Sequence, residues 1–109
     1  MFDDRYEVII VADGCSDNTV AQIGRIRDPH LKVLSYKKNH GKGFAICHGI
    51  KHASGEYITF YDAGGDFDAD HIDRFVKLSQ VFDADMVIGS KRHPASVVNY
   101  PTRRKILSF

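Results

Sequence analysis

The chain of 109 residues has few of the features that mark several large classes of protein. Its two cysteines, Cys15 and Cys47, lack metal-type spacing, so we expect a reducing compartment and no disulfide scaffold. No apolar run approaches the ~20 residues of a membrane span, and the start MFDDRYEV is too short and acidic for a signal peptide. The net charge is only +1, which gives no electrostatic reason to expect nucleic acid or an anionic membrane as partner.

The composition that remains is ordinary for a soluble globular protein, with 43% hydrophobic and 27% charged residues. A chain of this length forms one domain at most, which can bury roughly two-thirds of its unfolded surface. The chain opens directly on a strand that ends in a site motif, and it closes inside a helix. We therefore predict that residues 1–109 form a single, partial domain.

Continuous apolar runs alternate with helical patterns along the chain. Strands are predicted at residues 6–11, 31–36, 57–61 and 85–89, and helices at about 16–28, 42–54, 69–82 and from 102 onward. We expect Ser16 or Asp17 to cap the first helix and Gly55 to end the second. Apolar strands without alternation predict a parallel α/β sheet with helices outside, which binds ligands beyond the carboxyl ends of its strands.

An acidic loop, DAGGDFDADHID, follows the third predicted strand. Its five carboxylates belong to Asp62, Asp66, Asp68, Asp70 and Asp73. Clustered carboxylates repel one another, and a hard cation such as Mg²⁺ or Mn²⁺ relieves that repulsion. The alternative is a solvated turn with Asp68 or Asp70 as helix cap, and we prefer it for the last three residues. Asp62 ends a strand, so we prefer the metal-ligand interpretation there.

A basic loop, KKNHGKG, precedes the second predicted helix. Lys42 falls in the first helical turn, where a positive charge opposes the helix dipole. An anion bound at that helix end would make the charge favourable, and Gly41 and Gly43 would expose backbone N–H groups to it. A solvated basic turn is the alternative interpretation.

A further motif, VADGCSDNT, ends the first predicted strand. Helix capping accounts for its later residues but not for Asp13, and Gly14 allows a tight turn. His48 and His52 lie four apart on one helix, as in some zinc sites, but no third ligand has suitable spacing.

These segments together resemble the family 2 glycosyltransferases of the GT-A type, most closely the dolichol- or polyprenol-phosphate sugar synthases. VADGCSDNT stands where the family has VDDGSxDxT, and NHGKGFA matches NxGKGxA. GEYITFYDAGGDFDAD is similar to GDYIxFxDADxDxxP, ADMVIGSK to ADxVIGSR, and RRKILS to RRxxxS. The motifs keep the family's order and cover nearly the whole chain.

The resemblance implies a Rossmann-like GT-A fold, a UDP- or GDP-sugar donor, a divalent metal and an acceptor that includes lipid phosphates at a membrane surface. It implies donor-binding roles for Asp13, Gly14, Asn39, Lys42, Gly43 and Lys91. It implies metal binding by Asp62 and catalytic roles for Asp62 and Arg104, and Asp66 or Asp68 is our candidate for the second metal ligand, where the family's partner aspartate is replaced by Gly64. It also implies a cytoplasmic location, with peripheral attachment to the cytoplasmic membrane face as an open alternative.

The sequence departs from the family pattern at two acidic positions. Ala12 replaces the first aspartate of VDDGS, and Gly64 replaces the second aspartate of the metal motif. A truncated, non-catalytic module therefore stays open as an alternative to an enzyme. Such a module would form homo-oligomers through an exposed sheet edge, where the family's first strand is missing. A phospho-accepting receiver domain is a third hypothesis, but it gives the basic loop no role.

Overall fold

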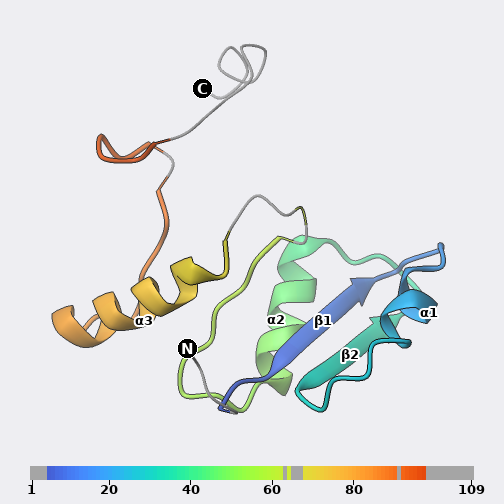
Figure 1. Cartoon of the computed structure of the whole chain (residues 1–109). Helices are drawn as coiled ribbons and strands as arrows, with labels where there is room; N and C mark the ends of the chain where they lie inside the picture. The colour runs from blue at the N-terminus through green and yellow to red at the C-terminus, as the bar shows by residue number, and fades with distance from the viewer. Residues whose placement is uncertain (1–4, 63, 65–67, 91, 98–109) are drawn as a thin grey trace. The chain divides into compact units, whose positions relative to one another are not determined.

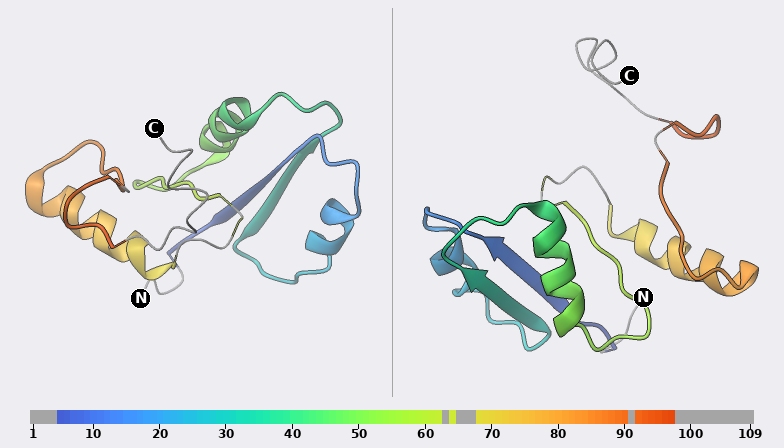
Figure 2. Two further views of the ribbon diagram at one scale, coloured as in Figure 1. Left: turned by 90° about the horizontal axis from the view of Figure 1, so that it is seen from above. Right: turned by 180° about the vertical axis from the view of Figure 1, so that it is seen from behind.

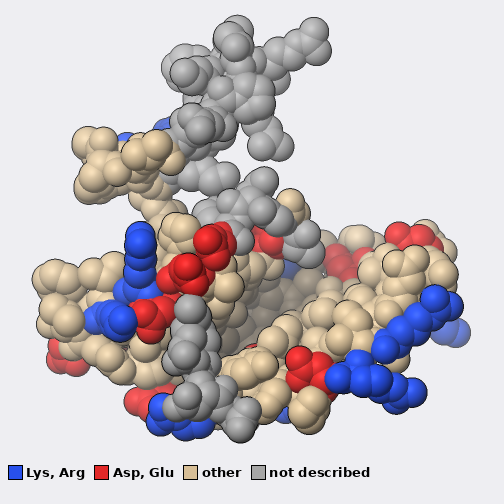
Figure 3. Space-filling view, in the orientation of Figure 1, with Lys and Arg blue, Asp and Glu red and all other residues tan. Residues whose placement is uncertain are grey.

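The computed structural model describes residues 5–62, 64, 68–90 and 92–97 (Figure 1). The chain folds as two compact units, Met1–Ala69 and Asp70–Phe109. In the described part, no helix is long and apolar enough to cross a membrane. Acidic and basic side chains are interspersed on the visible face in Figure 3, in keeping with the small net charge.

The first unit contains a parallel pair of strands with a helix on each face. Strand β1 (Val8–Asp13) pairs with β2 (Leu31–Tyr36), and their last residues, Asp13 and Tyr36, are partners in the register. Helix α2 (Lys42–His52) packs against β1, and the short helix α1 (Thr19–Ile23) contacts β2 from the opposite face (Figure 2). The predicted parallel α/β fold is confirmed.

Glu7, just before β1, connects three parts of this unit. One carboxylate oxygen accepts hydrogen bonds from the backbone N–H and the hydroxyl of Ser54, at 2.6 and 2.8 Å. The other accepts one from the Lys32 ammonium at 2.7 Å. The Lys32 bond, followed by the Ser54 bonds, lowers the pKa of Glu7 to about 2. Glu7 therefore holds the start of β1 to β2 and to the segment after α2.

Two of the predicted strands are absent from the described residues. Residues 57–61 and 85–89 carry no strand, and the sheet consists of β1 and β2 alone. Both predictions rested on apolar, β-branched runs, but a strand forms only when its backbone pairs with a neighbour. Ile58 and Phe60 are half or more exposed, whereas Ala12 in β1 is the one hydrophobic residue that the described part buries.

The helix boundaries differ from the predicted ones where side chains compete for the backbone. Asn18, not Ser16 or Asp17, is the N-cap of α1, because the Asp17 carboxylate accepts a bond from the Thr19 N–H and forms a turn before the helix. Helix α2 ends before Ala53, whose backbone is extended, and so Gly55 is not its cap. The bonds from Ser54 to Glu7 hold that segment outside the helix.

The second unit consists of α3 (Asp70–Phe82) and the segment that follows it. Asp73 and Lys77 form an ion pair one turn apart at 2.6 Å. After the helix, Asp83 takes a positive φ of 48°, and the Ala84 N–H donates to the Ser79 carbonyl at 2.9 Å. The predicted helix at 69–82 is confirmed to within one residue.

The Glu7 interactions predict acid-sensitive stability. The pKa of Glu7 falls from an ordinary 4.5 to about 2 on folding, so its contribution is complete above pH 4.5 and disappears as the pH falls through 2. We expect Glu7→Gln to lower the urea midpoint at pH 7, and the difference from wild type to shrink between pH 4.5 and 2. Circular dichroism in urea at a series of pH values measures both.

Glu56→Gln is the matched control, because Glu56 is an exposed glutamate of the same unit. Its midpoint should stay close to that of wild type at every pH. A Glu7→Gln difference that is constant from pH 7 to pH 2 would contradict the assigned role.

Candidate donor-binding site

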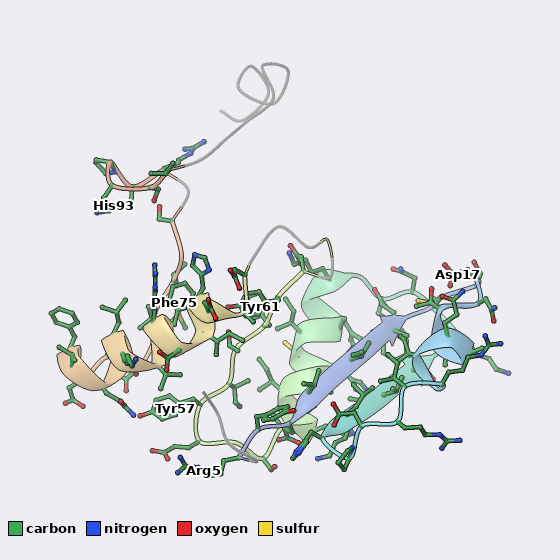
Figure 4. The ribbon with its side chains drawn as sticks, in the orientation of Figure 1. Arg5, Asp17, Tyr57, Tyr61, Phe75 and His93 are labelled. Carbon is green, nitrogen blue, oxygen red and sulfur yellow. The ribbon has the colours of Figure 1, made fainter. Side chains whose placement is uncertain are left out.

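The loops at the carboxyl ends of β1 and β2 meet in the first unit. Asp13 ends β1, the basic loop follows β2, and Asp62 lies at the end of an extended segment that starts after α2. Tyr57 and Tyr61 lie near the two ends of that segment, and Asp17 lies beyond the end of β1 (Figure 4). The edge of the sheet that the sequence predicts as the site is therefore the place where these loops gather.

Asp13 uses both carboxylate oxygens to hold the basic loop. Oδ1 accepts the backbone N–H of His40 at 2.8 Å, and Oδ2 accepts that of Gly41 at 2.9 Å. The bond from His40 holds the pKa of Asp13 below its usual range, against the opposing effect of burial. The carboxylate is thus ionised at neutral pH, and its remaining lone pairs are able to accept a bond from a ligand.

Asn39 and Gly14 complete this contact between the two loops. The Asn39 side-chain amide donates to the Asp13 carbonyl at 3.0 Å, and its oxygen accepts the Gly41 N–H at 3.0 Å. Gly14 has a φ of 65°, and a Cβ there would lie 2.3 Å from the Asn39 nitrogen. Only glycine allows the two backbones to approach so closely.

Tyr36 is a site residue that the sequence interpretation missed. Its hydroxyl oxygen is buried beside the Asp13 carboxylate. Burial, followed by the hydroxyl's interaction with the negatively charged Asp13 carboxylate, raises the pKa of Tyr36. The signal was available in the sequence, because the last residues of two adjacent parallel strands are neighbours.

Lys42 and Asp62 join the basic loop to the acidic loop. The Lys42 ammonium lies 2.7 Å from Oδ1 and 2.8 Å from Oδ2 of Asp62, and both side chains are more than 60% exposed. Lys42 is the first residue of α2, whose N-cap, Gly41, provides no side-chain hydrogen bond. The N-terminus of α2 therefore carries one positive and one negative side chain in contact.

Asp62 has the chemistry of a cation ligand. The Lys42 ammonium contacts both of its carboxylate oxygens, so the side chain already accommodates a positive charge. Across residues 5–62, 64, 68–90 and 92–97, no three or more His, Cys, Asp or Glu side chains form a group that could hold a metal ion. Asp68 is exposed and joins no such group.

Several predicted site residues lie outside the described part of the chain: Asp66, Lys91 and Arg104. Of those within it, Gly43 lies in the first turn of α2, and no described residue would come within 4 Å of a Cβ there.

Three histidines and a phenylalanine form a row of rings along α2 and the loop before it. His40, Phe44, His48 and His52 follow one another at centroid distances of 4.4, 5.9 and 4.7 Å. Tyr36 contacts the first three edge-on. A ring nitrogen of His52 lies 2.8 Å from the His48 carbonyl. Cys15 and Cys47 are both free, as expected.

Comparison with known proteins matches residues 2–107 to the model of "Glycosyl transferase family 2". A dolichyl-phosphate beta-glucosyltransferase, ALG5C, of Trichomonas vaginalis is 33% identical over 95% of this chain and 33% of its own length. The dolichyl-phosphate beta-glucosyltransferase of Dictyostelium discoideum is 32% identical over 81% of this chain and 29% of its own. A poly-beta-1,6-N-acetyl-D-glucosamine synthase of Staphylococcus epidermidis is 42% identical over 59% of this chain and 16% of its own.

The resemblance seen in the sequence motifs is thus confirmed. The chain spans a third or less of the length of these relatives. No solved structure matches the chain.

The close approach at Gly14 predicts a destabilising substitution. A Cβ at a φ of 65° costs about 1–2 kcal/mol, and the contact of 2.3 Å with the Asn39 nitrogen adds to that cost. We expect Gly14→Ala to lower the free energy of unfolding by at least this amount in urea denaturation. Gly43→Ala is the control, because a Cβ there meets nothing and alanine favours the helix. Equal loss in both variants would contradict the assigned backbone contact.

Proposed function

Because the chain belongs to glycosyl transferase family 2, we propose that it forms the nucleotide-sugar-binding part of a glycosyltransferase that uses a UDP- or GDP-linked donor. The observation that carries the proposal is the meeting of the Asp13 turn, the basic loop and Asp62 at the carboxyl edge of β1 and β2. That arrangement offers hydrogen-bond acceptors for a nucleoside and positive groups for a diphosphate. We treat residues 1–109 as a single partial domain of that enzyme.

The proposed roles follow from the chemistry of each group. Asp13 and Gly14 would bind the nucleoside, and Asn39 fixes their loop. Lys42, together with the N–H groups of the first turn of α2 at Gly43, would bind the diphosphate. Lys91 and Arg104 would add positive charge by analogy with the family motifs. The acceptor oxygen attacks the anomeric carbon, and the bond to the diphosphate breaks with its electron pair on the leaving group.

Family 2 enzymes typically use a divalent metal. For this chain we propose Mg²⁺ or Mn²⁺, with Asp62 as the first ligand and Asp66 and Asp68 as its candidate partners. The ion would supply positive charge to the leaving diphosphate. The position of Asp62 supports this role, because its exposed carboxylate contacts Lys42 at the N-terminus of α2, where the diphosphate would bind.

We propose a polyprenyl phosphate as acceptor, because relatives that align over most of this chain are named dolichyl-phosphate beta-glucosyltransferases. A phosphate acceptor is ionised at neutral pH and needs little help from a general base. Such an acceptor would place the protein at the cytoplasmic membrane face. A growing polysaccharide is the second candidate, since one relative is named as a polysaccharide synthase.

A non-catalytic, nucleotide-binding module is the alternative that Ala12 and Gly64 favour. Ala12 is only 4% exposed, so the position of the missing aspartate faces the interior of the unit. Such a module would bind UDP or GDP without hydrolysing or transferring a sugar. It would associate through the edge of β1 opposite β2, which has no ladder partner in the described residues. A sugar-release assay and light scattering distinguish the two functions.

The proposal predicts metal-dependent nucleotide binding. In calorimetric titrations of the folded chain, we expect UDP or GDP to bind more tightly with Mn²⁺ than with EDTA. Asp62→Asn removes the ligand charge and should weaken the Mn²⁺-dependent binding by about tenfold or more. Glu56→Gln, at an exposed acid that is not assigned to the site, should bind as wild type does.

Two results would count against parts of this proposal. Absence of binding to either nucleotide by a folded protein would exclude the donor site. Unchanged Mn²⁺-dependent binding in Asp62→Asn would move the metal to Asp66 or Asp68.

A further inference from the structure

The Lys42–Asp62 ion pair places a protein cation where the proposed metal would bind. The ammonium nitrogen lies 2.7 Å from Oδ1 and 2.8 Å from Oδ2 of the carboxylate. It therefore contacts both oxygens that a divalent cation would use. A cation that binds Asp62 must compete with Lys42.

The same pair places a protein anion at the start of α2. Lys42 is the first residue of the helix, and its N-cap, Gly41, has no side chain to bond the first N–H groups. Among the described residues, nothing would come within 4 Å of a Cβ at Gly41 or Gly43. The Asp62 carboxylate thus holds the lysine that a diphosphate would need, and a diphosphate must compete with Asp62.

We propose that the Lys42–Asp62 ion pair, which forms in the ligand-free protein, couples the binding of a cation to the binding of an anion. This inference rests on the proposed donor site. Asp62 releases Lys42 when it binds a cation, and Lys42 releases Asp62 when it binds a diphosphate. Each ligand therefore removes the competitor of the other, and the coupling is equal in both directions.

The size of the coupling follows from the exposure of the pair. Both side chains are more than 60% exposed, and exposed ion pairs are weak because water and salt screen them. Breaking the pair by substitution should change the affinity for either ligand by about two- to fivefold. The effect should decrease as the salt concentration rises.

The cation side is tested with Mn²⁺ alone, by electron paramagnetic resonance of the unbound ion. We expect Lys42→Met to bind Mn²⁺ about two to five times more tightly than wild type. Lys38→Met removes a lysine of the same loop that has no assigned contact with Asp62, and it should show a smaller gain. An equal gain in both variants, or no Mn²⁺ binding by either variant or wild type, overturns the coupling.

The anion side is tested with inorganic pyrophosphate in EDTA, by calorimetry. We expect Asp62→Asn to bind pyrophosphate about two to five times more tightly than wild type, because Lys42 is released. Glu56→Gln removes the same charge elsewhere in the unit and should show a smaller gain. Unchanged or weaker binding by Asp62→Asn overturns the coupling, and circular dichroism shows that each variant is folded.

The outcomes separate this inference from the proposed function. Metal-dependent nucleotide binding by wild type, with no gain in either variant, overturns the coupling and leaves the donor site in place. Gains in both variants, without nucleotide binding by wild type, support the competition and overturn the donor site.

Discussion

The site depends on the bonds that the Asp13 carboxylate accepts from the N–H groups of His40 and Gly41. They join the end of β1 to the loop after β2. Gly41, with a φ of 90°, is the N-cap of α2, so this contact fixes where the helix starts. Because Lys42 is the first helical residue, the same contact determines where its side chain meets Asp62. The Asp13 carboxylate thus positions both the loop after β2 and the Lys42 side chain.

Two carboxylates, one just before β1 and one at its end, accept hydrogen bonds from the segments at the two ends of α2. Asp13 accepts N–H groups just before the helix, and Glu7 accepts those of Ser54 just after it. Ala12 is the one hydrophobic residue that the described part buries fully, and apolar residues of α2 and β1 are part-buried where the helix packs on the strand. Bonds to Asp13 in β1 and to Glu7 just before it add polar contacts at the start and the end of the helix. Each of these carboxyl groups has a lowered pKa, which ties the placement of α2 to ionisation.

The sequence predicted those features that local pattern determines. The bounds of β2 and the span of α3 agree with their apolar periodicity, and Asp13, Lys42 and Asp62 were identified from position at predicted element ends. Strand pairing was less predictable, because an apolar run does not indicate which neighbouring strand its backbone will form hydrogen bonds with. The strands predicted at residues 57–61 and 85–89 were wrong for this reason. Tyr36 was missed because the first strand was predicted to end at residue 11, so Asp13 and Tyr36 were not seen to be the last residues of adjacent strands.

The departure from the family pattern at Gly64 removes one negative charge from the acidic loop. With aspartate at position 64, a second carboxylate would stand two residues from Asp62, and repulsion between the two would favour a divalent cation. With Gly64, the Asp62 carboxylate lacks that neighbour and is balanced by the Lys42 ammonium. A cation then gains less from relieving repulsion and must also displace a partner. In the proposed site, Gly64 would therefore strengthen the role of Lys42, because a weaker acidic site leaves its lysine with more influence on ligand binding.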